Sequence, residues 1–209
     1  PVPVVQGMNT PTSPLVQLPD AESVRLNLGS GDCPIEGYVN LDGLAGDSCY
    51  PLSAYPDHSV MEVRASHILE HFAYSQARAV LHEWVRVLKV GGVLKLAVPD
   101  FGWVVAQYLK GNPGNHPLEA VIMGGHKDEF DYHKAIYDRQ ALTALLEEVG
   151  LADVGTWECR EKDLAHLELS LRLQGVKQTP RPSADIHRAR AVPVVAPNLN
   201  GRESKGVRP

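Results

Sequence analysis

The chain has 209 residues, of which 44% are apolar and 22% charged, with a formal net charge of −5. This length supports one α/β domain with a substantial core, and the acidic balance argues against a nucleic-acid binder. No apolar run approaches the roughly 18–20 residues of a membrane span, and the first residues lack a signal-peptide pattern. The 3 widely spaced cysteines argue against a disulfide framework or a cysteine zinc site, so we expect a cytoplasmic protein.

The two ends of the chain differ in composition from its middle. Residues 1–23 are expected to form a proline-rich N-terminal arm, with five prolines among the first 19 positions. Residues 176–209 carry seven Lys or Arg against two acidic residues, and five prolines there prevent a long helix. We interpret this segment as a basic, flexible tail; the alternative is an arm that docks on a protein partner or an acidic substrate. The folded domain is expected over residues 24–175.

The folded part begins with a strand, a glycine turn and a second strand. The apolar run 24–28 ends at Gly29-Ser30-Gly31, and the run 38–41 ends at Asp42. Glycines at the carboxyl end of a strand let the backbone approach a ligand closely, and a carboxylate at the neighbouring strand tip can accept both hydroxyls of a ribose. Ligands of open α/β sheets bind in this crevice, so the stretch predicts a nucleoside-cofactor site.

Only six residues, 32–37, separate the glycine turn from the second strand. A full crossover helix needs about a dozen residues, so the first crossover helix is predicted to be reduced or missing. A dinucleotide site would need a third glycine and a long helix whose N-terminus holds the pyrophosphate. We therefore expect a cofactor without a pyrophosphate.

Beyond Asp42, the apolar periodicity alternates between strands and helices. Three helices are expected. The first begins at Ser75 and ends at Gly91-Gly92, the second covers 101–110, and the third runs from its cap Asp138 to Gly150. Strands are expected over 59–65, 93–98, 154–158 and 166–173. This alternation predicts an α/β fold with a doubly wound, mostly parallel sheet and helices on both faces.

Several motifs follow one another as in class I S-adenosylmethionine-dependent methyltransferases, and more narrowly resemble a bacterial-type subgroup with a shortened first crossover. They are LNLGSG (26–31), NLD (40–42), SHILEHF (66–72), EWVRVLKVGGVLKLAVPD (83–100), GGHKDEFDYHKAIYD (124–138) and ALTALLEEVGL (141–151). The resemblance covers about residues 24–154. It implies a Rossmann-like fold, S-adenosylmethionine as cofactor, and direct methyl transfer to a small-molecule or glycan acceptor, with positioning as the main source of acceleration.

The same resemblance assigns roles to residues that bind the cofactor. Those implied are Gly29, Ser30 and Gly31 for the methionine portion, Asp42 for the ribose diol, and His67 and Leu69 near the methionine end. Asn27 stands where the family often has an acid, although its amide can still bond to backbone or to an ammonium group. Asp47 is the only candidate for the acidic residue that contacts the adenine amine.

The acidic segment around residue 131 supplies a candidate base. A histidine with a near-neutral pKa can take the proton of the acceptor, and we choose His133, with Asp131 as its orienting partner. The alternative is a solvated acidic loop whose histidine merely packs. Asp100 follows the fourth expected strand, where acceptor-handling residues of such enzymes often lie; the alternative is a cap on the next helix.

Two other interpretations use the same residues. Residues 67–71 match HxxEH, a zinc-protease signature, but two histidines four positions apart face one metal only on a long helix. Here the motif ends a strand, so we expect no metal and assign His71 to capping or packing. The third interpretation is a non-catalytic module that binds cofactor or acts as a scaffold in a larger assembly; Asn27 and the short crossover motivate it.

Overall fold

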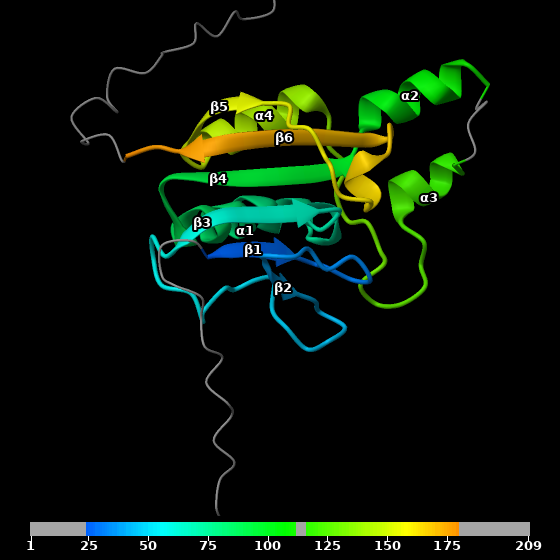
Figure 1. Ribbon diagram of the computed structural model, residues 1–209. Coiled ribbons are helices and arrows are strands. Elements are labelled where there is room, and N and C mark those ends of the chain that lie inside the picture. The colour runs from blue at the N-terminus through cyan, green and yellow to red at the C-terminus, as the bar shows by residue number, and fades with distance from the viewer. Residues whose placement is uncertain (1–23, 112–115, 180–209) are drawn as a thin grey trace, which may run out of the picture. The chain divides into compact units, whose positions relative to one another are not determined.

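The computed structural model describes residues 24–111 and 116–179. The expected N-terminal arm and the tail beyond Thr179, with its docking alternative, lie outside the described residues. The described chain forms one six-stranded sheet in the order β2-β1-β3-β4-β6-β5 (Figure 1). The strands are β1 (Arg25–Leu28), β2 (Val39–Leu41), β3 (Val60–Ser66), β4 (Leu88–Pro99), β5 (Leu151–Gly155) and β6 (Ser170–Lys177).

The sheet is parallel through its first half and antiparallel at one edge. β1 pairs in parallel with β2 and with β3, and β3 pairs in parallel with β4. β6 runs antiparallel to both β4 and β5. The parallel half brings the carboxyl ends of β1, β2 and β3 to the same side, where ligands of such sheets bind. The expected α/β, mostly parallel architecture is confirmed.

No helix follows β1 or β2 within the described ranges: residues 29–38 and 42–59 form turns and irregular segments. The predicted loss of the first crossover helix is confirmed, and the connection from β2 to β3 lacks a helix as well. The helices are α1 (Tyr74–Val87), α2 (Phe101–Leu109), α3 (Leu118–Met123) and α4 (Arg139–Glu148), with two short 3-10 turns, η1 (Leu69–His71) and η2 (Leu164–His166). None of these is long and apolar enough to cross a bilayer.

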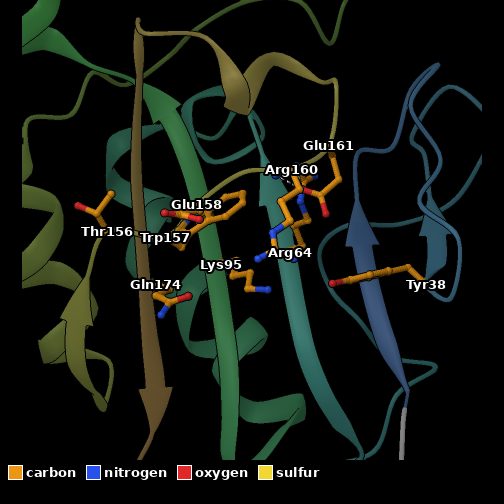
Figure 2. A pocket seen from close by; sticks show the side chains of 9 residues that line it. All are labelled: Tyr38, Arg64, Lys95, Thr156, Trp157, Glu158, Arg160, Glu161 and Gln174. Carbon is orange, nitrogen blue, oxygen red and sulfur yellow. Dashed lines mark hydrogen bonds and ion pairs between the residues drawn. The ribbon is translucent and has the colours of Figure 1, made fainter.

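The helices α1 and α4 pack on one face of the sheet and bury the main core. Their fully buried Trp84 and Leu142 join Leu26, Val63 and Leu94 of the strands in one apolar cluster. Figure 2 views the opposite face, with the helices behind the strands. That face is polar, and the segment 156–169, which includes the short turn η2, lies over it. The helices α1 and α4 of the described chain therefore lie on the same face of the sheet.

The polar face is ordered by contacts among its own side chains. Lys95 Nζ lies 3.0 Å from Glu62 Oε1, and the buried Arg64 lies 2.6 Å from Asp163 Oδ2. Trp157 donates its indole N–H to the carbonyl of Leu96 at 3.1 Å. The contacts of Arg64 and Trp157 attach the segment 156–169 to β3 and β4, whereas the contact of Lys95 joins β4 to β3.

The boundary between α1 and β4 differs from the prediction. The helix expected to run to Gly91 ends at Val87, because β4 begins at Leu88 and pairs with Val60. Gly91 and Gly92 lie inside this strand at its irregularity, where a Cβ on Gly92 would approach the carbonyls of Lys89 and Met61 to 2.9 and 3.0 Å. The glycine pair thus permits a bulge between β3 and β4 and does not end the helix.

The two last strands are displaced from the expected positions. β5 occupies Leu151–Gly155 instead of 154–158, because it begins directly after the turn at Gly150. β6 occupies Ser170–Lys177 instead of 166–173, because residues 164–166 form η2. The expected domain bounds, residues 24 and 175, stay a prediction. The helix α3 has no counterpart in the prediction.

Candidate functional site

A cavity of about 710 Å³ opens where β1, β2 and β3 end. This size is in the range of small-molecule and cofactor sites. Its wall combines backbone, acidic, apolar and imidazole groups, from Gly29, Gly31, Asp42, Asp47, Ile68, His71 and Phe130. Two predicted glycines and two predicted aspartates therefore meet at one cavity.

The glycine turn allows close backbone approach at the end of β1. Gly29 has φ +63°, and a Cβ there would lie 1.8 Å from Cδ1 of Ile68. Gly31 has φ +46° and open space around it. The N–H of Ser30 donates to the carbonyl of Leu41 at 3.0 Å, which attaches the turn to β2. Only glycine fits at position 29, for both its conformation and its space.

Asp42 lies in a tight turn at the end of β2. Its Oδ1 accepts the N–H of Leu44 at 3.1 Å, and its own N–H donates to Asp47 Oδ2 at 3.2 Å. The Asp42 carbonyl accepts the N–H groups of Ala45 and Asp47 at 3.1 and 2.9 Å. The loop thus fixes the carboxylate of Asp42 at the cavity, and this acceptor group suits a ribose diol. Asp47 also lines the cavity, with one carboxylate oxygen engaged by its own loop.

Apolar side chains supply the flat wall that a purine base requires. Tyr50, Ile68, Phe72 and Phe130 line the cavity, and the ring of Phe130 would lie 3.7 Å from a Cβ on Gly43. Sequence reasoning missed these four residues, because each lies in a loop without periodicity. Together with the glycine turn and Asp42, they make a cavity whose chemistry fits S-adenosylmethionine.

Asn27 is buried and engaged in the fold. Its amide donates to Asn40 Oδ1 at 2.9 Å, and its Oδ1 accepts from Nη1 of Arg64 at 3.2 Å. It lies at a smaller hollow of about 290 Å³ that shares Gly29 and Gly31 with the main cavity. These contacts explain the departure from an acidic residue at this position, because the amide joins β1 to both neighbouring strands.

His67 and Leu69, which the resemblance placed near the methionine end of the cofactor, do not line the main cavity. Leu69 is fully buried in the main core. His67 lines the smaller hollow, with Nδ1 3.1 Å from Glu70 Oε1 and Nε2 2.8 Å from Ser170 Oγ. Because Ser170 gives its hydroxyl proton to the carbonyl of Leu164 at 2.7 Å, Nε2 of His67 is the donor to Ser170.

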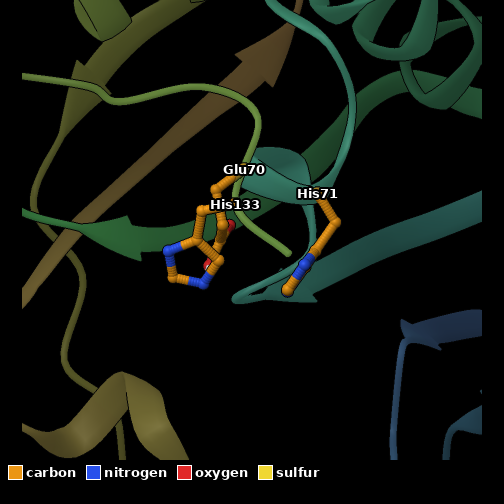
Figure 3. A group of neighbouring side chains, drawn as sticks. All are labelled: Glu70, His71 and His133. Atoms are coloured by element: carbon orange, nitrogen blue, oxygen red, sulfur yellow. The ribbon is translucent and has the colours of Figure 1, made fainter. Parts of the chain in front are cut away.

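Glu70, His71 and His133 form one group beside the cavity (Figure 3). His133 Nε2 lies 4.0 Å from Glu70 Oε1, and the two imidazole rings are 5.0 Å apart, edge to face. Burial lowers the pKa of His133, against the opposing effect of Glu70. Burial would raise the pKa of Glu70, but His67 and His71 outweigh it and lower that pKa. His71, assigned from the sequence to packing, lies on the cavity wall.

The other two predicted catalytic residues have structural partners. Asp131 Oδ2 accepts the N–H of Lys127 at 3.2 Å, whereas Nδ1 of His133 lies 3.1 Å from the carbonyl of Val121. Val121, and not Asp131, therefore orients the His133 ring. Asp100 caps α2 by accepting the N–H of Gly102 at 2.8 Å, as its alternative interpretation predicted.

A further hollow of about 390 Å³ lies on the polar face of the sheet (Figure 2). Its two buried or half-buried strand cations, Arg64 and Lys95, are paired with Asp163 and Glu62. Both cations also lie over the ring of Trp157, at 5.5 and 6.0 Å from its centre. These contacts account for the hollow as part of the packing between the segment 156–169 and the sheet.

No protein-family model matches this chain, and no curated protein matches its sequence. Among solved structures, it is similar to an S-adenosylmethionine-dependent methyltransferase from Archaeoglobus fulgidus, at 15% identity over 75% of this chain and 87% of that one, with a TM-score of 0.50. An O-methyltransferase family protein from Burkholderia thailandensis is 12% identical over 75% of this chain, which spans 51% of that protein, with a TM-score of 0.48. The first likeness shows that the chain has the class I methyltransferase fold expected from its motifs.

Proposed function

We propose that this protein is an S-adenosylmethionine-dependent methyltransferase that acts on a small-molecule or glycan acceptor. The observation that carries the proposal is the meeting of the Gly29–Gly31 turn and the Asp42 carboxylate at one cavity of about 710 Å³. In this fold, that edge of the sheet is where a nucleoside ligand binds.

Each part of the cavity has a role in this proposal. The backbone at Gly29 and Gly31 receives the methionine portion, Asp42 accepts the ribose hydroxyls, and Phe130 covers the base. The bound cofactor supplies an electrophilic methyl group. The chain then holds the acceptor in line with that group and excludes water, so positioning accounts for most of the acceleration.

The acceptor also has to lose a proton, and the imidazoles beside the cavity are suited to handle it. His71 Nδ1 lies 3.2 Å from the carbonyl of Tyr132, so this nitrogen carries the proton and Nε2 keeps its lone pair. His71 lines the cavity whereas His133 is not among its lining residues, so we assign the role of base to His71. The proposed base is thus His71, a spatial neighbour of His133, whereas the sequence analysis chose His133.

Isothermal titration calorimetry with S-adenosylmethionine and with its demethylated product tests the proposal. We expect both to bind with one site per chain. The control is Glu119→Gln, an exposed charge on α3 that does not line the cavity. Absence of binding of either compound at millimolar concentration would refute the proposal.

Incubation of a lysate with a radioactive methyl donor tests catalysis separately. Transfer of label to a small molecule or glycan supports an enzyme. Binding of the cofactor without any labelled acceptor, combined with co-elution with a fixed partner, would instead favour the scaffolding alternative.

A further inference from the structure

Glu70 presents a buried carboxylate with one close side-chain neighbour, His67. The side chain is fully buried, and Nδ1 of His67 lies 3.1 Å from Oε1. The other oxygen, Oε2, has no hydrogen-bond partner among the described residues. Buried carboxylates are normally paired and hydrogen-bonded, or bound to a metal. The free oxygen of Glu70 therefore requires an explanation.

The backbone brings two imidazoles to this carboxylate from different parts of the chain. His71 is adjacent to Glu70 in η1. The Glu70 carbonyl accepts the N–H groups of Lys134 and Ala135 at 2.7 and 3.2 Å, which holds the neighbouring His133 beside it. The arrangement is thus fixed by main-chain contacts and not by the side chains alone.

The tautomers of both imidazoles follow from their partners. Nδ1 of His71 lies 3.2 Å from the carbonyl of Tyr132, and Nδ1 of His133 lies 3.1 Å from the carbonyl of Val121. A carbonyl only accepts, so each Nδ1 is the donor, and in the neutral ring each Nε2 keeps a lone pair that can bind a metal ion. Metal-ligating histidines typically donate the other ring nitrogen to a carbonyl in this way.

We propose that Glu70, His71 and His133 bind a divalent transition-metal ion, with Zn²⁺ as the preferred ion. One ligand atom from each side chain lies within 4.8 Å of the other two (Figure 3). Two imidazoles and one carboxylate are a known three-ligand set for catalytic zinc. With metal–ligand bonds of about 2.0–2.2 Å, tetrahedral ligand atoms lie roughly 3.3 Å apart, so a bound ion would draw the three ligand atoms closer together than the 4.8 Å within which they lie here.

This site differs from the zinc motif considered on the sequence. There, His67 and His71 were the paired ligands; in the structure, His67 bonds to Glu70 and Ser170, and His133 takes its place. His67 then has a supporting role, because ligating carboxylates are themselves commonly hydrogen-bonded. We expected no metal because His67 and His71 could face one ion only on a long helix. A site that uses His133 in place of His67 needs no such helix, because His133 reaches Glu70 from another part of the chain.

The fourth coordination position would open toward the cavity, since His71 lines it. An ion there would occupy Nε2 of His71, so this imidazole would no longer act as the base; the ion itself would instead lower the pKa of a bound water molecule or acceptor oxygen. This catalytic role rests on the proposed function, whereas metal binding itself does not.

The test is equilibrium dialysis of chelator-treated protein against zinc chloride alone, with metal content measured by mass spectrometry. We expect one zinc ion per chain in the wild type, and at least tenfold weaker binding in His71→Ala and in His133→Ala. His82→Ala is the matched control, because His82 is exposed on α1 and lies outside the group. Glu70→Gln keeps the shape of the side chain and is expected to weaken zinc binding similarly.

Cobalt loading gives a second measurement that does not depend on activity. The visible absorption of the cobalt protein should change in His71→Ala and not in His82→Ala. Absence of stoichiometric zinc in the wild type, or equal zinc binding by wild type, His71→Ala and His133→Ala, would overturn the proposal. No methyl donor is present in either measurement, so failure of the metal site and failure of the proposed function are distinguishable.

Discussion

Arg64 and Asp163 form an ion pair of 2.6 Å between positions 99 residues apart, with only 2% and 11% of the two side chains exposed. Arg64 also donates to Asn27 Oδ1 at 3.2 Å and lies over the ring of Trp157. The pair attaches the segment 156–169 to the polar face of the sheet. A buried guanidinium tolerates the loss of such a partner poorly.

Replacing Asp163 by Ala should therefore destabilise the fold. The substitution leaves the Arg64 charge buried with its main partner removed, and we expect a loss of about 3 kcal/mol in the free energy of unfolding. Urea denaturation measures this value, with Glu119→Gln as an exposed-charge control. A loss below about 1 kcal/mol would show that the more distant Glu161, 3.9 Å from Arg64, compensates.

The same pair predicts an acid dependence of stability. Burial alone would raise the pKa of Asp163, but the hydrogen bond from Arg64 outweighs it and lowers that pKa. The unfolded carboxyl has a pKa of about 3.9. At a pH between the folded and the unfolded pKa of Asp163, the unfolded state therefore binds more protons than the folded state. Stability from this group is complete above the unfolded pKa and is lost as pH falls through the folded one. Unfolding midpoints measured from pH 6 down to about 2 should depend less on pH in Asp163→Asn than in the wild type.

Gly29→Ala should damage the cavity more than Gly31→Ala. Both glycines have positive φ, which costs a residue with a Cβ about 1–2 kcal/mol. Only at Gly29 would the new Cβ also collide with Ile68, at 1.8 Å from Cδ1, and such overpacking costs a further 1–3 kcal/mol, roughly. Thermal unfolding with and without the demethylated cofactor measures both effects. Equal midpoints in the two variants would contradict the close contact between the glycine turn and Ile68.

Asp42→Asn tests the ribose contact with minimal change of shape. Hydrogen bonds to a charged group contribute about 1.5–3 kcal/mol each, so we expect roughly 10- to 100-fold weaker binding of the demethylated cofactor. The same calorimetric titration measures it, and unfolding in urea checks that the turn at Leu44 survives. Unchanged affinity would exclude Asp42 as the ribose acceptor.

Local signals made part of the fold predictable from the sequence. The turn at Gly29, the acidic end of β2 and the short first crossover are all encoded by neighbouring residues. The same holds for α4, whose N-cap Asp138 accepts the N–H of Ala141 at 2.8 Å as expected. The class I fold itself followed from the order of these local motifs.

Features that depend on distant contacts were not predictable. A glycine after a helical pattern is a common signal for the end of a helix, but Gly91 and Gly92 instead lie at the irregular pairing between β3 and β4. The pairing of Glu70 with His133 depends on a main-chain bond between residues 64 positions apart, from the N–H of Lys134 to the Glu70 carbonyl. The spacing of apolar residues along the sequence cannot predict a hydrogen bond between such distant positions. The sequence analysis therefore chose Asp131 as the neighbour of His133.

The short edge strand β2 determines how the cofactor pocket behaves in solution. It has three residues, all half-buried, and within the described sheet it pairs only with β1. Segments with few buried contacts open locally at lower free energy than the global unfolding reaction. Amide protons of residues 39–47 should therefore exchange sooner than those of β3, and bound cofactor should slow them. Ligand binding then has to stabilise the pairing of β2 with β1, and this lowers the net binding free energy. We therefore expect substitutions in β2 to change the affinity for the cofactor even where they do not contact it.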